Sequence, residues 1–271
     1  MPHLLSMTAT PIPRSLALTV YGDLDLSILT ERPHGRKSII TKLVPEQYRS
    51  WVYDFIRKEV SKGHQGFIIC PLIDASDVLE VRSVKEEYAR LQSGELHDIR
   101  IGILHGKMKP QEKESGMQDM LEKKIDVLLS TSVVEVGIDI PNATFILIEG
   151  AERFGLAQLH QFRGRVGRSA LQSYCFILPT ESKKEELTRL KVFVSSNDGF
   201  YLAEKDLELR GEGDVLGSRQ SGIPFLTLAD LKDTASIKKS QVYSEEICGH
   251  LSDYPLLIAR LQQIEADVHL E

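Results

Sequence analysis

Short apolar runs alternate with amphipathic stretches along the chain from Lys37 to Leu178. The runs are rich in Ile, Leu and Val, as buried parallel strands are, while the stretches between them carry apolar residues at helical spacing. We predict strands at Lys37–Val44, Gly66–Leu72, Arg100–Leu104, Asp126–Leu129, Thr144–Ile148 and Ser173–Leu178. Helices are predicted at Glu46–Lys62, Val78–Leu91 and Pro110–Lys123. Strands that alternate with helices favour the α/β class, with a parallel sheet flanked by helices.

The pattern changes after Pro179, where charged stretches with apolar residues at helical spacing replace the strands. Between Gly211 and Gly222 there are four glycines, which predict an extended loop. Loops of that length inside a compact domain are usually functional or disordered. Helices are predicted at Glu181–Val194, Asp198–Leu209, Leu226–Leu231 and Ser244–Ile264.

Most of the candidate chemistry lies between Asp126 and Arg168. The first apolar run there ends in the hydroxyls Ser130-Thr131-Ser132, and a break containing Gly137, Asp139 and Pro141 separates it from the second run. We predict that the two runs are neighbouring strands. Ligands of α/β sheets bind at the carboxyl ends of strands, where we expect the hydroxyls and the Gly-Ile-Asp triplet to lie.

The same stretch closes on Gln161-x-x-Gly164-Arg165-x-Gly167-Arg168. Two arginines three apart on a short helix share a face, and the glycines allow a phosphate to approach the backbone. Guanidinium groups suit the negative charge of a phosphoryl group in transfer. Surface salt bridging is the alternative reading of both arginines.

These residues resemble conserved motifs of superfamily 2 helicases and translocases. The stretch STSVVEVGIDIP is similar to their motif V, QFRGRVGR to motif VI, and MTATPIPRS near the start of the chain to motif III. The resemblance implies a RecA-like lobe in which Arg165 and Arg168 reach the ATP phosphates across a cleft, one of them as an arginine finger. It also implies that Gln161 orients that site, and that Asp139 and Gly137 lie near the ATP ribose.

The resemblance further implies that Thr131, His105, Gly106 and Lys107 contact a nucleic-acid strand. A hydroxyl and a backbone N–H at the end of a strand suit a phosphate, but Thr131 also fits a helix N-cap. His105 fits an ordinary polar side chain equally well, so both readings stay open.

A narrower resemblance covers two further stretches, AERFGLAQLHQ at Ala151–Gln161 and NDGFYLAEKDLELRGEGDVLGSRQSG at Asn197–Gly222. Both are similar to the RecG family of bacterial ATP-dependent helicases, which act on branched DNA in repair and recombination. That resemblance implies that Arg189, Arg210 and Gln220 couple ATP-driven lobe motion to duplex DNA. Two alternatives remain: a transcription-repair coupling translocase, which shares this motif, and a non-catalytic module that binds DNA or protein. The alternatives to a coupling role are that Arg210 caps a helix and that Gln220 is an ordinary surface residue of a loop.

The family comparison suggests three regions: the end of a first motor lobe and a linker at 1–35, the second lobe at 36–180, and a translocation hairpin, loop and helical tail at 181–271. A phosphate-binding GxxxxGK[ST] loop and an acidic Mg²⁺-binding motif do not occur in the 271 residues. We therefore expect the C-terminal part of a longer motor, inactive alone. Binding of ATP and Mg²⁺ would need the first lobe. The partners of this chain would be that lobe, a wedge domain, and double-stranded or branched DNA.

Composition adds limits to this picture. A net charge of −6 argues mildly against nucleic acid, but four arginines and no carboxylate lie between Arg153 and Arg168. Three widely spaced cysteines show no metal-ligand spacing, and we expect Cys70 and Cys175 to be reduced core thiols. No apolar run is long enough to span a membrane, so a cytoplasmic protein is expected. Asp206 reads as a solvated charge.

Overall fold

The computed structural model describes residues 35–71, 77–131, 139–180, 183–210 and 234–268, together with Leu5, Met7 and Ser27. The chain divides into two compact units. The first consists of Met1–Pro11 and Thr30–Asp206, and the second of Ile12–Leu29 and Leu207–Glu271. Each unit is described by itself.

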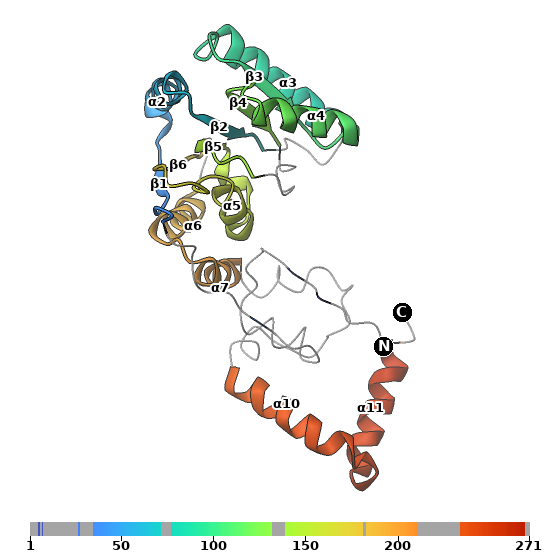
Figure 1. Ribbon diagram of the computed structural model, residues 1–271. Coiled ribbons are helices and arrows are strands. Elements are labelled where there is room, and N and C mark those ends of the chain that lie inside the picture. Colours follow the sequence, from blue (N-terminus) through green and yellow to red (C-terminus); the bar gives the residue numbers. More distant parts are fainter. Residues whose placement is uncertain are drawn as a thin grey trace. The chain divides into compact units, whose positions relative to one another are not determined.

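The first unit is built on a six-stranded parallel sheet (Figure 1). Its strands are β1 (Ile40–Leu43), β2 (Gln65–Ile69), β3 (Ile101–Leu104), β4 (Val127–Ser130), β5 (Ala143–Glu149) and β6 (Tyr174–Leu178). They lie in the order β1-β6-β5-β2-β4-β3, and every neighbouring pair is parallel. The predicted α/β class, with a parallel RecA-like sheet, is confirmed.

Strands β4 and β5 are not neighbours, so that prediction was wrong. Strand β2 lies between them and pairs with both. Gly66 of β2 stands opposite Phe145 of β5, and a Cβ at Gly66 would collide with the ring and carbonyl oxygen of Phe145. The close approach of these two backbones places β2 at the centre of the sheet. Runs that are buried on both faces carry no signal in their own sequence for which of them pair.

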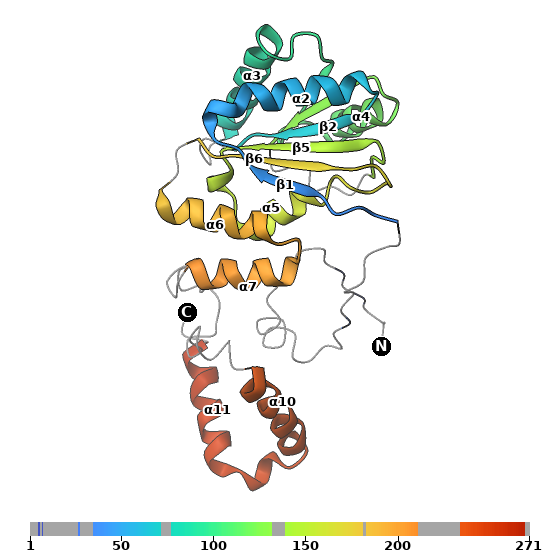
Figure 2. The same cartoon turned by 90° about the vertical axis from the view of Figure 1, so that its left-hand side faces the viewer.

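Helices cover both faces of the sheet (Figure 2). Helices α2 (Arg49–Ser61, preceded by the 3₁₀ turn η1, Glu46–Tyr48) and α3 (Asp77–Ser93) cover one face. Their buried side chains share a core with Ile68, Phe145 and Phe176 of the strands. The opposite core holds side chains of α4 (Pro110–Leu121), α5 (Leu156–Arg163, preceded by the 3₁₀ turn η3, Ala151–Arg153), α6 (Lys184–Ser195) and α7 (Gly199–Arg210). The predicted helices of the first unit are thus present with shifted ends.

Helix α6 and α7 as far as Asp206 belong to the same compact unit as the sheet. Leu190, Phe193 and Leu202 are fully buried in the core that α5 shares. The boundary that the sequence suggests after residue 180 therefore lies inside this unit, which extends to Asp206. Cys70 and Cys175 are buried and free, as expected.

The described part of the second unit contains α10 (Thr234–Cys248), the 3₁₀ turn η4 (Leu251–Asp253) and α11 (Pro255–Val268). A single helix over Ser244–Ile264 was predicted, and this is wrong. Gly249 begins a turn, and Pro255 disfavours helical backbone at Tyr254, whose φ and ψ are −120° and 67°. The helix predicted at Leu226–Leu231 lies outside the described residues.

Candidate functional site around helix α5

The candidate arginines Arg165 and Arg168 lie in a loop that follows α5. We expected both on a short helix, but α5 ends at Arg163, with Gly164 as its C-cap. The amide of Arg165 then donates to Phe162 O at 2.9 Å in a tight turn. Gly164 keeps right-handed helical backbone (φ −67°, ψ −6°), and the left-handed glycine that follows the helix is Gly167. Arg165 is therefore carried by the turn and Arg168 by the loop that follows it, and both side chains are half-buried.

Gly167 fixes the course of this loop. Its φ is +75°, a left-handed conformation that side chains with a Cβ rarely adopt. A Cβ at this position would lie 2.9 Å from Cγ1 of Ile39 and 3.8 Å from Cβ of Ser173. Ile39 and Ser173 immediately precede β1 and β6, so the loop lies against the amino ends of these strands.

Arg168 meets Asp139 across the loop. Its Nη1 is 3.5 Å from Oδ1 of Asp139, and its Nε donates to Gly164 O at 3.3 Å. The Asp139 side chain is 57% exposed, so this ion pair is open to solvent and contributes about 1 kcal/mol or less. A doubly charged phosphate could therefore compete for the guanidinium. The structure thus brings together two of the predicted nucleotide residues, while Gly137 lies outside the described residues.

Asp139 lies toward the amino end of β5, which corrects the placement predicted for it. Parallel strands require the chain to return from the carboxyl end of β4 to the amino end of β5 before it enters the sheet again. Asp139 stands at the end of that return, just before the turn at Pro141 and Asn142. Of the described residues in that prediction, Ser130 is the last residue of β4 and Thr131 follows it, so these two lie at the carboxyl end of a strand.

The candidate nucleic-acid residues gather at the carboxyl edge of β3 and β4. These strands are paired with Leu104 opposite Ser130, so His105 and Thr131 follow neighbouring positions. Thr131 is buried, and its amide donates to Leu104 O at 3.4 Å. Lys107 is exposed, and Gly106 O accepts from Lys113 Nζ at 2.7 Å. The described residues predicted to bind the nucleotide therefore lie toward the amino ends of the strands. Those predicted to bind nucleic acid lie toward the carboxyl ends.

Two charged residues near α5 have roles that the sequence did not indicate. Arg163, counted among the basic residues of motif VI, is 2% exposed and donates to backbone oxygens of α6 and of the turn after it. Asp206, expected to be solvated, is 8% exposed, and its Oδ1 accepts from the Leu156 amide at 3.3 Å. The first residue of α5 is preceded by Gly155, which offers no side-chain cap, so Asp206 supplies the missing acceptor.

The predicted coupling residues are only partly described. Arg189 of α6 donates through Nη2 to the backbone oxygen of Glu152 in η3. Arg210 is the last residue of α7, but its side chain lies outside the described set, and Gln220 lies outside it altogether. The backbone amide of Thr180, which follows β6, donates to Glu152 Oε2 at 3.3 Å. Arg189 therefore links the first helix of the predicted hairpin to the turn that precedes α5.

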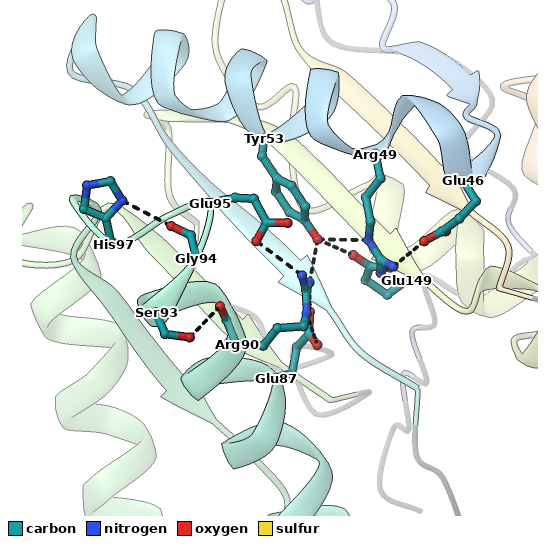
Figure 3. Close-up of polar contacts among 10 residues, drawn as sticks. All are labelled: Glu46, Arg49, Tyr53, Glu87, Arg90, Ser93, Gly94, Glu95, His97 and Glu149. Atoms are coloured by element: carbon teal, nitrogen blue, oxygen red, sulfur yellow. Dashed lines mark hydrogen bonds and ion pairs between the residues drawn. The ribbon is translucent and has the colours of Figure 1, made fainter.

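A network of buried and half-buried charges on the other face was also missed (Figure 3). Glu149, the last residue of β5, accepts from Arg49 and from the hydroxyl of Tyr53, the latter at 3.0 Å. Arg90 of α3 donates to the Tyr53 hydroxyl at 2.7 Å and to both carboxylate oxygens of Glu87. The network therefore joins α2, α3 and β5. The sequence signal for this network is a carboxylate that directly follows the apolar run Phe145–Ile148.

Burial shapes the protonation of this network. It raises the pKa of the Glu149 carboxyl above its ordinary value, and the opposing charge of Arg49 limits that rise. Burial, followed by the charge of Glu149, also raises the pKa of Tyr53, so the phenol keeps its proton and donates it. For Arg49 burial acts in the opposite direction, but Glu149 and Tyr53 outweigh it and raise the pKa.

The loop after α5 carries side chains that suit a phosphate. Among the described residues, no group of three or more His, Cys, Asp or Glu side chains could hold a metal ion. The loop contains the two guanidinium groups of Arg165 and Arg168, which match the charge and geometry of phosphate oxygens. The same described portion of the chain has no helix that is long and apolar enough to cross a membrane.

Comparisons with known proteins find matches to helicases, and to RecG helicases in particular. Residues 48–170 match the family "Helicase conserved C-terminal domain", and residues 196–254 match "ATP-dependent DNA helicase RecG, domain 3, C-terminal". The RecG helicase of Synechocystis sp. is 47% identical over 236 residues, which cover 87% of this chain and 28% of that protein. That of Escherichia coli (strain K12) is 43% identical over 249 residues, or 91% of this chain and 36% of that protein.

A solved structure of RecG bound to a three-way DNA junction is similar as well. It matches with a TM-score of 0.69 and 43% sequence identity, over 85% of this chain and 30% of that one. The chain spans about a third of the length of the curated relatives it matches. The similarity therefore covers the sheet and the α6–α7 hairpin together, but a minor part of each relative.

Proposed function

This chain belongs to the RecG family of DNA helicases, and from that premise we propose that it forms the second motor lobe of an ATP-dependent helicase that acts on branched DNA in repair and recombination. The observation that carries the proposal is the order of two matches along one chain. A helicase C-terminal domain over residues 48–170 is followed by a RecG-specific region over residues 196–254. The second match supports RecG over a transcription-repair coupling translocase and over a non-catalytic binding module.

In this proposal Arg165 and Arg168 bind the phosphates of ATP held between two lobes. One of them stabilises the charge on the γ-phosphoryl group during transfer, and Gln161, half-buried on α5, orients the site. Asp139 holds the Arg168 guanidinium at 3.5 Å until a phosphate takes its place, and with Gly137 it lies near the ribose. ATP supplies the transferable phosphoryl group. Mg²⁺ would be held by the phosphates and by carboxylates of the first lobe.

We assign the DNA contacts to the carboxyl ends of β3 and β4. Lys107 is exposed just after β3 and offers its charge to a backbone phosphate, next to half-buried His105 and Gly106. Thr131 is fully buried at the end of β4, so it would support this surface rather than lie on it. Arg189, Arg210 and Gln220 would couple the motion of the lobes to duplex DNA. A first lobe and a wedge domain would complete the motor, which would work in the cytoplasm on chromosomal DNA.

The test compares the isolated chain with a complete motor. The complete motor is a RecG protein in which this chain replaces the matching region. We expect the isolated chain to show no ATP hydrolysis above background, with or without DNA, because its two arginines face only half of a nucleotide site. The complete motor should hydrolyse ATP in a DNA-stimulated reaction, measured by phosphate release. DNA-stimulated hydrolysis by the isolated chain, or none by the complete motor, would contradict the proposal.

A further inference from the structure

Residues 164–171 form the arginine loop, which carries the two candidate arginines from the end of α5 toward β6. At Gly167 this loop lies against residues that precede β1 and β6, the two strands at one edge of the sheet (Figure 2). We propose that Gln172 and Ser173 are positioning residues of the ATPase, which hold the arginine loop where it meets a nucleotide. This inference deepens the proposed function and rests on it.

The side chain of Gln172 fastens β1 to β6 at their amino ends. Its Nε2 donates to Ser38 O at 2.8 Å and to Ser173 O at 3.1 Å. Ser173 O also accepts the Ile40 amide at 3.0 Å, at the first residue pair of the two strands. Both hydrogens of the Gln172 amide are therefore used. The amide extends the pairing of the edge strand with β6 back to Ser38.

The stretch that Gln172 fastens supports the arginine loop. A Cβ at Gly167 would lie 2.9 Å from Cγ1 of Ile39 and 3.8 Å from Cβ of Ser173. Gly167 precedes Arg168 directly, so a change in this support reaches a candidate arginine within one residue. The position of the guanidinium therefore depends on how closely the loop packs against the first residues of the two strands.

The hydroxyl of Ser173 can bond the loop in a second position. Ser173 is 1% exposed, and its Oγ has no hydrogen-bond partner among the residues that the structure describes. A buried hydroxyl without a partner costs free energy, so an arrangement that supplies one is favoured. A serine hydroxyl both donates and accepts, and the backbone of the loop at Gly167 lies beside it. A short movement of the loop can therefore supply the partner.

The first position of the loop is held by a weak contact. Arg168 lies 3.5 Å from Asp139, and this ion pair is open to solvent. In the proposal the guanidinium turns from Asp139 to the charge that develops on the γ-phosphoryl group, and the loop moves with it. The Ser173 hydroxyl then bonds the loop. Because this bond is made in the transition state, its loss should fall on kcat rather than on KM.

Ser173→Ala tests the hydroxyl with two measurements of opposite sign. In the complete motor, kcat for ATP hydrolysis should fall about threefold to tenfold, as expected for one lost hydrogen bond, with KM within about twofold of wild type. Urea unfolding of the isolated chain should show a variant at least as stable as wild type, because a buried hydroxyl without a partner is removed. A serine with a merely structural role would lose stability and activity together.

Thr41→Val is the matched control. Thr41 Oγ1 on β1 is also buried without a hydrogen-bond partner in the described part of the chain. The atoms nearest to a Cβ at Gly167 belong to Ile39 and Ser173, so Thr41 does not support the loop directly. Valine has the shape of threonine, and this variant should be at least as stable as wild type with kcat within about twofold. Unchanged kcat in Ser173→Ala, an equal loss in Thr41→Val, or a less stable Ser173→Ala chain would overturn the role of the hydroxyl.

Gln172→Met tests the fastening of the strands. Methionine keeps the length of the side chain and adds no charge, but it cannot donate to the two carbonyl oxygens. Hydrogen exchange of the Ile40 amide in the isolated chain, followed by NMR, should become about threefold to tenfold faster as the pairing opens at this end. The kcat of the complete motor should fall by a similar factor. Unchanged exchange at Ile40, or faster exchange with normal kcat, would overturn the role of Gln172.

Failure of this inference is distinguishable from failure of the proposed function. A wild-type complete motor that hydrolyses no ATP would contradict the proposed function and, with it, the catalytic use of both residues. A motor that hydrolyses ATP normally in Ser173→Ala and in Gln172→Met would leave the proposed function standing and would overturn only the positioning roles.

Discussion

Replacement of Arg165 or Arg168 by alanine is expected to lower ATP turnover of the complete motor by about 10³-fold to 10⁵-fold, the range measured for arginine fingers. The guanidinium groups act on charge that develops during phosphoryl transfer, so the loss should fall on kcat. The affinity for branched DNA should remain within a few-fold of wild type. The proposed DNA contacts lie at the carboxyl ends of the strands, whereas the arginine loop lies against the amino ends. Steady-state phosphate release and fluorescence anisotropy on one preparation measure both quantities.

Arg153→Ala provides the control for this prediction. Arg153 is an exposed arginine in η3, so its removal changes net charge equally but leaves the loop after α5 intact. Near-normal turnover in Arg165→Ala and in Arg168→Ala would reduce both residues to surface cations. A loss of DNA binding that matches the loss of turnover would place them in the DNA site instead.

Glu149→Ala should destabilise the first unit by about 3 kcal/mol, since removal of one partner from a buried ion pair leaves uncompensated charge. The cost lies at the lower end for such pairs, because the Arg49 side chain is 27% exposed and keeps Glu46 at 2.7 Å. In a unit of this size the melting temperature should fall by roughly 6–12 °C. Urea and thermal unfolding of the chain at pH 7 measure the change.

Glu46→Ala tests whether burial is the cause. Glu46 pairs with the same guanidinium, but its side chain is 57% exposed, so its removal should cost no more than about 1 kcal/mol. Equal destabilisation by the two variants would show that the Arg49 charge, and not the buried carboxylate of β5, holds α2 against the sheet.

The periodicity of the sequence predicted the sheet of the first unit well, because the inner strands β2, β4, β5 and β6 are buried on both faces and stand out as apolar runs. It could not predict which strands are neighbours. The pairing of β2 with β5 depends on the contact between Gly66 and Phe145, which are far apart in sequence. The break between α10 and α11 could have been found, since Gly249 and Pro255 are both turn signals.

The residues of the candidate site were likewise predicted in part from the sequence and missed in part. The motifs indicated Arg165, Arg168 and Asp139, and the structure brings Arg168 and Asp139 within 3.5 Å of each other. Arg163 and Asp206 were missed because their partners are backbone atoms of other elements, to which no sequence pattern refers. In Arg163 a residue inside a motif proved to be buried, so membership of a basic stretch did not indicate exposure.

The most direct test of the central claim is ATP-dependent unwinding of a three-way DNA junction by the complete motor, followed as release of a labelled strand. The account predicts unwinding that requires ATP and Mg²⁺, and none by the Arg165→Ala motor under the same conditions. Junction binding without strand release by the wild-type complete motor, at an ATP concentration that saturates hydrolysis, would contradict it.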